Sequence, residues 1–145
     1  MLALLQRVEN ASVVVSGETV GAIDQGLLVF LGVQQGDDLA HCERLAAKVV
    51  NYRVFADEQG RMNRSVIDSG GGVLVVSQFT LAADTRKGLR PSFTPAAEPE
   101  LAEALYEAFI AQVGVSVAGV QSGRFGADMR VSLCNDGPVT FLLSS

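Results

Sequence analysis

The first third of the chain alternates apolar and polar residues in the manner of β-strands. Residues 2–15 are rich in Val and Leu with polar residues between them, which is typical of a strand with one buried face. Residues 16–18 give a turn signal and lead into a second strand over residues 19–24. The run 27–33 is apolar on both faces and therefore predicts a central strand. We expect three antiparallel strands at the start of the fold.

Two later segments place apolar residues at helical spacing. Asp37 or Asp38 can cap a first helix that ends near Asn51, with the apolar positions Leu39, Cys42, Leu45, Ala46, Val49 and Val50. A second helix begins at Pro99 and ends near Gly114, and its predicted apolar face consists of Leu101, Leu105, Ala108, Phe109, Gln112 and Val113.

The remaining pattern predicts short strands and loops. A polar, glycine-rich loop up to Gly72 and a long connection up to Pro95 separate the strand-like runs. These runs are residues 54–55, 73–79, 115–121, 129–134 and 139–143. Because strands outnumber helices and many are adjacent, we expect one α+β domain over residues 1–145. Its architecture should be a mostly antiparallel curved sheet or β-barrel with two packed helices.

The composition is that of an ordinary globular protein. Hydrophobic residues make up 48% of the 145 and charged residues 19%, without a low-complexity tract, which excludes disorder. No apolar run approaches the ~20 residues of a membrane helix, and no basic leader precedes the first apolar residues. We therefore expect a cytosolic protein without membrane contact.

Neither a metal site nor a cofactor is expected. Cys42 and Cys134 lie far apart without the paired spacing of a zinc site, and we expect both to be free, buried thiols. His41 is the only histidine and lies off the apolar face of the first helix, so we expect it to be exposed. These residues give no ligand cluster.

Two short motifs carry the candidate chemistry. Ser77-Gln78-Phe79-Thr80 follows the apolar run of a buried strand, and Gly137-Pro138 lies between two short apolar runs near the end of the chain. Proline lacks an N–H group and restricts φ, so this pair predicts a rigid turn or protrusion, and its peptide bond is either cis or trans. Together with the Val139-Thr140 that follows, the two motifs closely resemble the signatures of the D-aminoacyl-tRNA deacylase family, and the resemblance covers the whole chain.

The resemblance implies a homodimeric hydrolase that cleaves the ester of D-aminoacyl-tRNA and acts without a cofactor. In the family, the Gly-Pro pair is cis and enters the active site of the partner subunit. Arg7 matches the arginine that braces this loop, and Met129 matches a residue beside it. The family also acts on mischarged glycyl-tRNA such as glycyl-tRNA(Ala), because glycine has no side chain to obstruct.

Ester hydrolysis of this kind makes a modest catalytic demand. The ester is already activated by the α-ammonium group, so a positioned water and donors for the developing oxyanion are sufficient. A Ser/His triad is disfavoured because His41 belongs to another segment, and Lys48 and Lys87 lie on a helix and a loop. Thr80 has three open roles: a structural hydroxyl, the nucleophile, or a neighbour of a reaction in which the tRNA 2′-OH activates water. We favour the last, with main-chain N–H groups of Phe79 and Thr80 as donors and with Ser77 and Gln78 shaping the pocket.

Chirality is the harder problem. D- and L-esters contain the same atoms, and contacts to one small apolar group distinguish substrates by only about 1–3 kcal/mol. Strong rejection needs an obstruction, and rigid backbone carbonyls of a cis Gly137-Pro138 would supply one.

A net charge of −5 argues against a broad nucleic-acid-binding surface. One local basic cluster, Arg86, Lys87 and Arg90, follows the first motif. It is either a solvated loop or a contact with the tRNA acceptor end. Two other functions stay open from sequence: a binding module without chemistry, and a metal-dependent hydrolase, which the missing ligand cluster disfavours.

Overall fold

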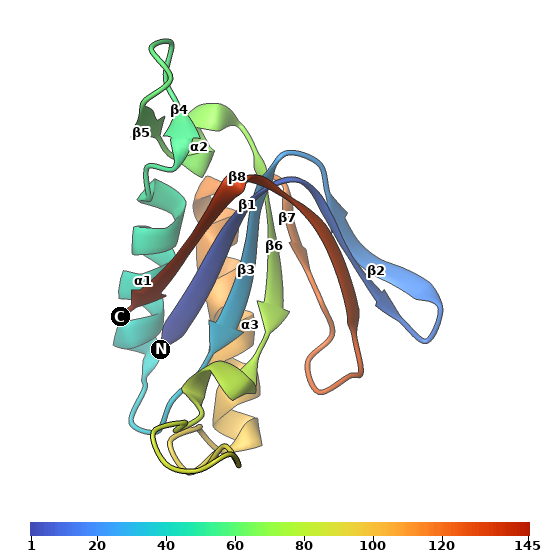
Figure 1. The fold of residues 1–145 in the computed structure, drawn as a ribbon, viewed down its shortest axis with the longest axis vertical. Coiled ribbons are helices and arrows are strands. Elements are labelled where there is room, and N and C mark those ends of the chain that lie inside the picture. Colours follow the sequence, from blue (N-terminus) through green and yellow to red (C-terminus); the bar gives the residue numbers. More distant parts are fainter.

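The computed structural model describes residues 1–145, which form one curved, mixed sheet with helices on one side (Figure 1). The strand order is β2-β1-β3-β6-β7, and β8 pairs with the other edge of β1. The strands of this sheet are β1 (Leu2–Val15), β2 (Glu18–Ile23), β3 (Gly26–Gly32), β6 (Gly72–Ser77), β7 (Val120–Ser122) and β8 (Arg130–Ser144). The predicted α+β class and the curved, barrel-like sheet are confirmed.

The sheet is mixed rather than mostly antiparallel. The pairs β1 with β2, β1 with β3 and β1 with β8 are antiparallel, whereas β3 with β6 and β6 with β7 are parallel. The parallel pairs arise where a helix connects the strands, since a helical crossover returns the chain to the same end of the sheet. The prediction of three antiparallel strands at the start is confirmed, with β3 as the central strand.

Two long helices cover one face of the sheet, as predicted. Helix α1 (Leu39–Asn51) begins after Asp38, whose side chain accepts a hydrogen bond of 2.9 Å from the His41 N–H group. Helix α3 (Pro99–Ser116) continues past Gly114, the predicted end. Its buried face also differs from the prediction, because Leu101 is exposed while Ala102 and Tyr106 are buried.

Small elements and the C-terminal strands were not fully predicted. The loop before Gly72 contains β5 (Met62–Arg64), which pairs with β4 (Phe55–Ala56), and a one-turn helix α2 (Val66–Ser69). Residues 115–121 are mostly the end of α3 and the start of β7 rather than a strand. The two predicted runs 129–134 and 139–143 belong to the single long strand β8. The Gly-Pro pair therefore interrupts one strand instead of joining two.

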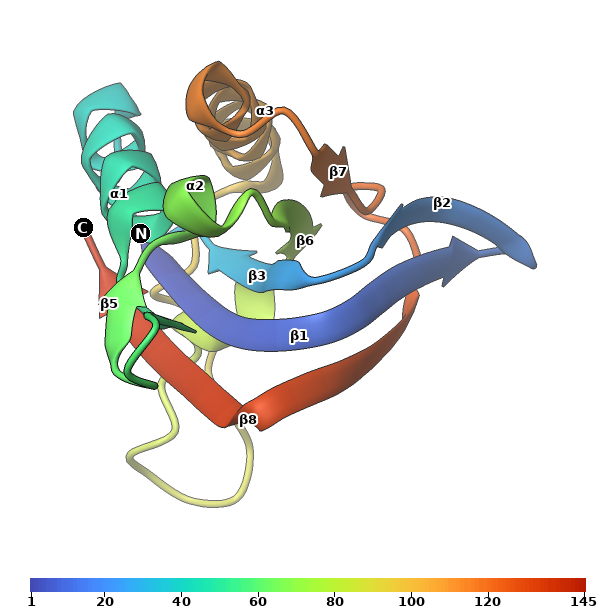
Figure 2. The ribbon, with the colours of Figure 1, turned by 90° about the horizontal axis from the view of Figure 1, so that it is seen from above.

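The sheet has apolar cores on both faces. The larger core lies between the sheet and the helices and includes Leu5, Val29 and Phe109. The smaller core lies inside the curl of the sheet and includes Val8, Val13 and Leu74. Figure 2 shows α1 and α3 together on one side while β1 and β8 bend around the other. Because it bends, β1 supplies side chains to both cores.

The close approach of β3 and β6 gives a stability prediction. A Cβ atom at Gly26 would lie 1.9 Å from the carbonyl oxygen of Gly72 on the parallel neighbour, so Gly26→Ala should lower the free energy of unfolding by about 3 kcal/mol. Gly114→Ala is the control: it lies in α3 with open space around it and should stabilise by up to about 1 kcal/mol. Urea titration of both variants measures this, and wild-type stability of Gly26→Ala would contradict the packing argument.

Candidate active site

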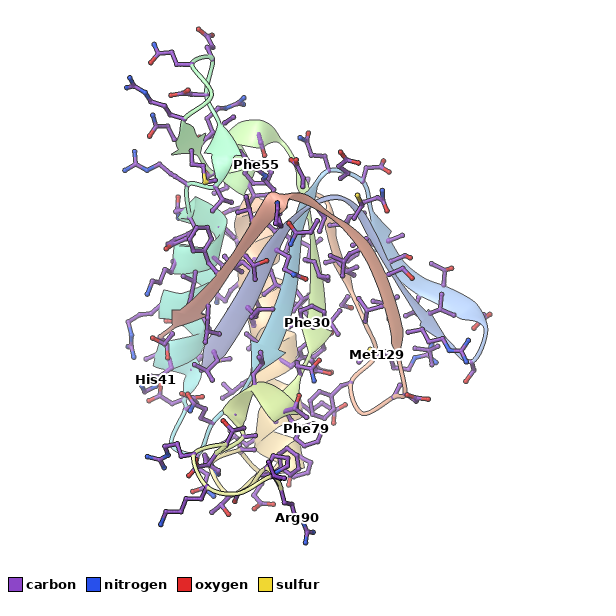
Figure 3. All side chains as sticks on the ribbon, in the orientation of Figure 1. Phe30, His41, Phe55, Phe79, Arg90 and Met129 are labelled. Carbon is purple, nitrogen blue, oxygen red and sulfur yellow. The ribbon has the colours of Figure 1, made fainter.

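A cavity of about 500 Å³ lies where β6 ends, and most of its walls are apolar. Three segments enclose it: the end of β6 with the residues that follow, the start of α3, and the connection between β7 and β8. Figure 3 shows Phe79 and Met129 at this place. The lining residues are Val76, Ser77, Gln78, Phe79, Ala96, Ala97, Pro99, Ala102, Phe125, Gly126, Ala127, Met129 and Val131. Ser77, Gln78, Phe79 and Met129 were singled out from the sequence.

Sheet pairing positions the first motif. Ser77 is paired with Leu31 of β3, and the Gln78 N–H group donates a hydrogen bond of 2.8 Å to the Leu31 carbonyl. The chain then turns into the short 3₁₀ helix η1 (Phe79–Ala82). Gly32 leaves room for this turn, because a Cβ atom there would lie 3.0 Å from the Leu81 Cβ atom. The motif thus turns over the end of the central strand and forms one wall of the cavity.

Thr80 is exposed, and its hydroxyl group accepts a hydrogen bond from the Gln78 Nε2 group. An amide is not a base, so this partner orients the hydroxyl without removing its proton. His41 is bound elsewhere: its Nδ1 atom lies 2.6 Å from the Asp38 carboxylate on α1. Phe79 and Thr80 are the first residues of η1, and no side chain caps it, so their N–H groups lack helical partners. The wall therefore offers main-chain donors.

The opposite wall contains residues that the sequence analysis missed, chiefly Phe125 and Ala127 in the connection between β7 and β8. A buried tyrosine holds this connection against β6, because the Tyr106 hydroxyl group donates to the Val75 carbonyl at 2.9 Å and approaches the Gly123 carbonyl at 3.3 Å. Burial raises the pKa of Tyr106 to about 12. An aromatic residue between two glycines, Gly123 and Gly126, was the available sequence signal.

Gly137 and Pro138 lie in a bulge of β8. Gln6 of β1 is paired with Thr140 and Val8 with Asn135, so only Arg7 stands opposite residues 136–139. The Asn135 side chain closes the bulge by accepting a bond of 2.7 Å from the Val139 N–H group. Both Gly137 and Pro138 are exposed, and the bond between them is cis. The pair forms a protrusion on the surface, one of the two forms that the motif predicted.

Arg7 fills the space beneath this bulge, with a side chain only 14% exposed. Its Nη1 group donates to the Val54 carbonyl at 2.6 Å, and its Nε group donates to the Asp136 carbonyl at 3.1 Å. The Nε group also lies 3.1 Å from the Asp136 carboxylate. Arg7 therefore connects the bulge to the segment that leads into β4.

Within one chain, the two motifs do not meet. Arg7 is paired with Leu27 of β3, and Leu27 with Val73 of β6, four residues before Ser77. Four residues of strand span roughly 13 Å, and two further strands intervene. Met129 lies in the cavity with Ser77 and not beside the Gly-Pro pair of its own chain. The predicted site residues therefore form two groups on one subunit.

The basic cluster follows η1, and its three cations differ. Arg86 is paired with Asp84, with Nη2 2.7 Å from Oδ2 and Nε 2.9 Å from Oδ1. The side-chain bond from Arg86 holds the pKa of Asp84 below its ordinary value. Lys87 and Arg90 are exposed and form no salt bridge. Two of the three predicted cations are thus free to meet an anion.

The cysteine prediction is half wrong. Both thiols are free, but only Cys42 is buried, whereas Cys134 is exposed because it lies on the outer edge of β8. Burial raises the pKa of the Cys42 thiol to about 11. The side chains of His, Cys, Asp and Glu form no group of three that could hold a metal ion. None of the helices is long and apolar enough to cross a membrane.

The comparison with family models decides the family. The model described as D-Tyr-tRNA(Tyr) deacylase matches residues 4–144. The chain belongs to this family. Its activity is that of a D-aminoacyl-tRNA deacylase, a hydrolase that cleaves the ester of D-aminoacyl-tRNA in translation quality control. The resemblance inferred from the two motifs is confirmed, and a binding module without chemistry is no longer the favoured alternative.

Relatives of the deacylase match along their whole length. A D-aminoacyl-tRNA deacylase of Shewanella amazonensis is 62% identical over 143 residues, which is 99% of each chain. One of Stutzerimonas stutzeri is 61% identical over 145 residues and 100% of each chain.

Solved structures match the fold. A structure titled c-Myc DNA Unwinding Element Binding Protein has a TM-score of 0.95 and 42% identity, over 100% of this chain and 99% of that one. A probable eukaryotic D-amino acid tRNA deacylase has a TM-score of 0.86 at 16% identity, over 99% of this chain and 98% of that one, and shows the same fold.

The contacts of Arg7 predict how strongly it stabilises the deacylase. Arg7→Met should lower the free energy of unfolding by about 2 kcal/mol or more, because two carbonyls lose their donor and each costs about 1–3 kcal/mol. The neighbouring Gln6→Ala removes one exposed hydrogen bond to Thr140 and should stay within about 0.5 kcal/mol of wild type. Urea unfolding at one fixed protein concentration tests both. Equal stability of the two variants would remove Arg7 from its bracing role.

Proposed function

We propose that the protein is a homodimeric trans-editing enzyme in which the Gly137–cis-Pro138 pair of each subunit stands in the cavity of the other. It hydrolyses D-aminoacyl-tRNA and mischarged glycyl-tRNA such as glycyl-tRNA(Ala), and it rejects L-aminoacyl-tRNA. We expect it to act in the cytoplasm, where tRNAs are charged. The observation that carries this proposal is the separation of an exposed, braced Gly-Pro protrusion from the cavity of the same chain.

An uncovered apolar row supports the dimer. Leu142 is paired with Leu4, Leu4 with Phe30, and Phe30 with Val76, so these four side chains point to the same face of the sheet. The helices cover the opposite face. Leu142 is 58% exposed, and Leu4 and Phe30 are half-buried. Such a row favours burial against a second copy.

The same row leads into the cavity, because Val76 is one of the lining residues. A second subunit that covers Leu142, Leu4 and Phe30 would therefore lie beside the mouth of the cavity. In a two-fold dimer, each protrusion can then reach the other cavity.

The protrusion suits a chiral filter. A side chain of L configuration can be rejected only by an obstruction that does not yield. Arg7 and the Asn135 side chain hold both ends of residues 136–139. Gly137 has φ 137°, and a Cβ atom there would lie 2.6 Å from Val139 Cγ2. The obstruction would thus consist of backbone atoms alone, and an achiral glycyl group would pass it.

Catalysis in this proposal relies on the backbone and the substrate. The N–H groups of Phe79 and Thr80 stabilise the developing oxyanion and bind the terminal nucleotide, and Ser77 and Gln78 shape the cavity. The 2′-OH group of the tRNA's terminal ribose activates the water. The hydroxyl group of Thr80 is engaged by the Gln78 amide and faces no base, which argues against a threonine nucleophile.

A subunit-mixing experiment tests the filter. Gly137→Ala homodimers should cleave L-tyrosyl-tRNA or lose activity, because the added Cβ displaces the bulge. Ala96→Trp should fill the cavity and abolish activity, since Ala96 lines it. Mixing the two variants forms hybrid dimers in which one cavity and one filter are intact. About a quarter of all sites should then hydrolyse D-tyrosyl-tRNA and glycyl-tRNA(Ala) while rejecting L-tyrosyl-tRNA.

A protrusion acting on its own chain would give no such recovery, because no chain in the mixture carries both intact parts. Gly17→Ala is the matched control: it also forces a residue with positive φ, 85°, but lies in the β1–β2 turn with open space around it. It should lower stability and leave the discrimination between D- and L-esters unchanged.

Thr80→Ala should retain substantial deacylase activity, because the main-chain N–H group survives the change. A D-tyrosyl-tRNA whose terminal ribose lacks the 2′-OH should lose much more. Single-turnover rates of ester loss compare the two directly. Loss of all turnover by Thr80→Ala, with normal cleavage of the deoxy substrate and intact tRNA binding, would make Thr80 the nucleophile.

Lys87 and Arg90 should contact tRNA phosphates. Changing both to Ala should raise KM and flatten the dependence of log KM on log salt concentration by about 0.7 per lost contact to a single strand. The selectivity between D- and L-esters should stay unchanged, because phosphate contacts do not inspect the amino acid. Arg86→Ala should have a smaller effect, since Asp84 already occupies it. Arg44 and Lys48, exposed on α1, provide a control pair, and an unaltered salt dependence would leave the cluster a solvated loop.

A further inference from the structure

Two phenylalanine rings stand exposed at the mouth of the cavity. Phe79 is 59% exposed and Phe93 is 43% exposed, and their ring centroids lie 5.0 Å apart with an angle of 55° between the ring planes. Phe79 lies in η1 and lines the cavity, whereas Phe93 belongs to the loop before α3. Figure 3 places Phe79 between Met129 and Arg90. The pair connects the cavity with the basic cluster.

The rings contribute to neither apolar core. Exposed aromatic surface that does not serve the core favours a role in binding. Phe93 is nevertheless held by its backbone and its neighbours. The N–H and carbonyl groups of Asp84 and Ser92 bond each other at 2.8 and 3.0 Å, and the Ala96 N–H group donates to the Phe93 carbonyl at 2.9 Å. The second ring is therefore presented outward by an ordered segment.

The surroundings favour a nucleic-acid ligand over a second apolar surface. Lys87 and Arg90 lie in the same loop as Phe93 and have no carboxylate partner. Aromatic rings beside free cations are the combination that binds single-stranded nucleic acid, in which bases stack on rings and cations meet phosphates.

We propose that Phe79 and Phe93 form a stacking platform for the base of the terminal nucleotide of the tRNA, with Phe93 as a positioning residue. This inference rests on the proposed function, in which the aminoacyl group occupies the cavity. The ester joins that group to the terminal ribose, so the base of the same nucleotide lies one sugar away, at the mouth. Stacking there orients the ribose and its 2′-OH group relative to the N–H groups of Phe79 and Thr80.

The test uses two small esters, 3′-D-tyrosyl-adenosine and the corresponding D-tyrosyl ester of a base-free methyl riboside. Phe93→Ala should raise KM for the adenosine ester about 10-fold, the loss expected for one base stacked on an aromatic ring, with kcat nearly unchanged. KM for the base-free ester should not change. Phe93→Trp should restore the low KM, and Val115→Ala, which removes an exposed apolar side chain on α3, should leave both esters unaffected.

Equal effects of Phe93→Ala on both esters would reveal a structural role and overturn the platform, as would a KM for the adenosine ester that does not respond. A change in the mass of the particle in solution would instead place Phe93 between subunits and also overturn it. Failure of the proposed function looks different: the wild-type protein would then not prefer the D-ester of adenosine over the L-ester.

Discussion

The pairing of β1 on both of its edges constrains the rest of the molecule. One edge pairs with β8 along nearly its whole length, and the other pairs first with β3 and then with β2. Because both ladders must remain in register, residues 136–139 of β8 have no partner except Arg7 and leave the sheet as a bulge. The exposed Gly-Pro pair follows from this mismatch in length, and the buried guanidinium beneath it satisfies the carbonyls that the ladder leaves free.

The cavity illustrates how little side-chain chemistry this reaction needs. Its walls are mostly apolar, its one nearby hydroxyl group is engaged by an amide, and the only histidine is bound to Asp38 on a helix. What the wall offers is shape and main-chain donors at the start of η1. An activated ester with an internal hydroxyl group needs positioning more than it needs a strong base. The fold provides that positioning through the pairing of Ser77 and Gln78 with Leu31.

The sequence predicted what periodicity and short motifs encode. The alternation in β1, the apolar run of β3 and the helical spacing of α1 each follow from one buried face, so their positions were predicted closely. The parallel pairing of β6 was not predictable, since it depends on which end of the sheet a helix returns to. Nor was the burial of Ala102 in place of Leu101, because a shift of one residue around α3 is decided by its packing.

For the site, the motifs gave the residues but not their arrangement. Ser77, Gln78 and Phe79 line one cavity with Met129, while Gly137, Pro138 and Arg7 lie elsewhere on the same chain. Phe125 was missed because an aromatic residue in a glycine-rich connection carries no periodic signal. The pairing of Arg86 with Asp84 was also invisible, since only the turn of the loop brings the two side chains together.

The bulge of β8 also separates the evolution of the protrusion from that of the sheet. Elsewhere in this strand, one inserted or deleted residue would turn every following side chain to the other face, moving Leu143 out of the core. Residues 136–139 are not paired with β1, and Asn135 and Thr140 hold the ladder on either side of them. A change of length inside the bulge is therefore absorbed locally. The protrusion can lengthen or shorten while the register of the barrel, and with it the core, stays the same.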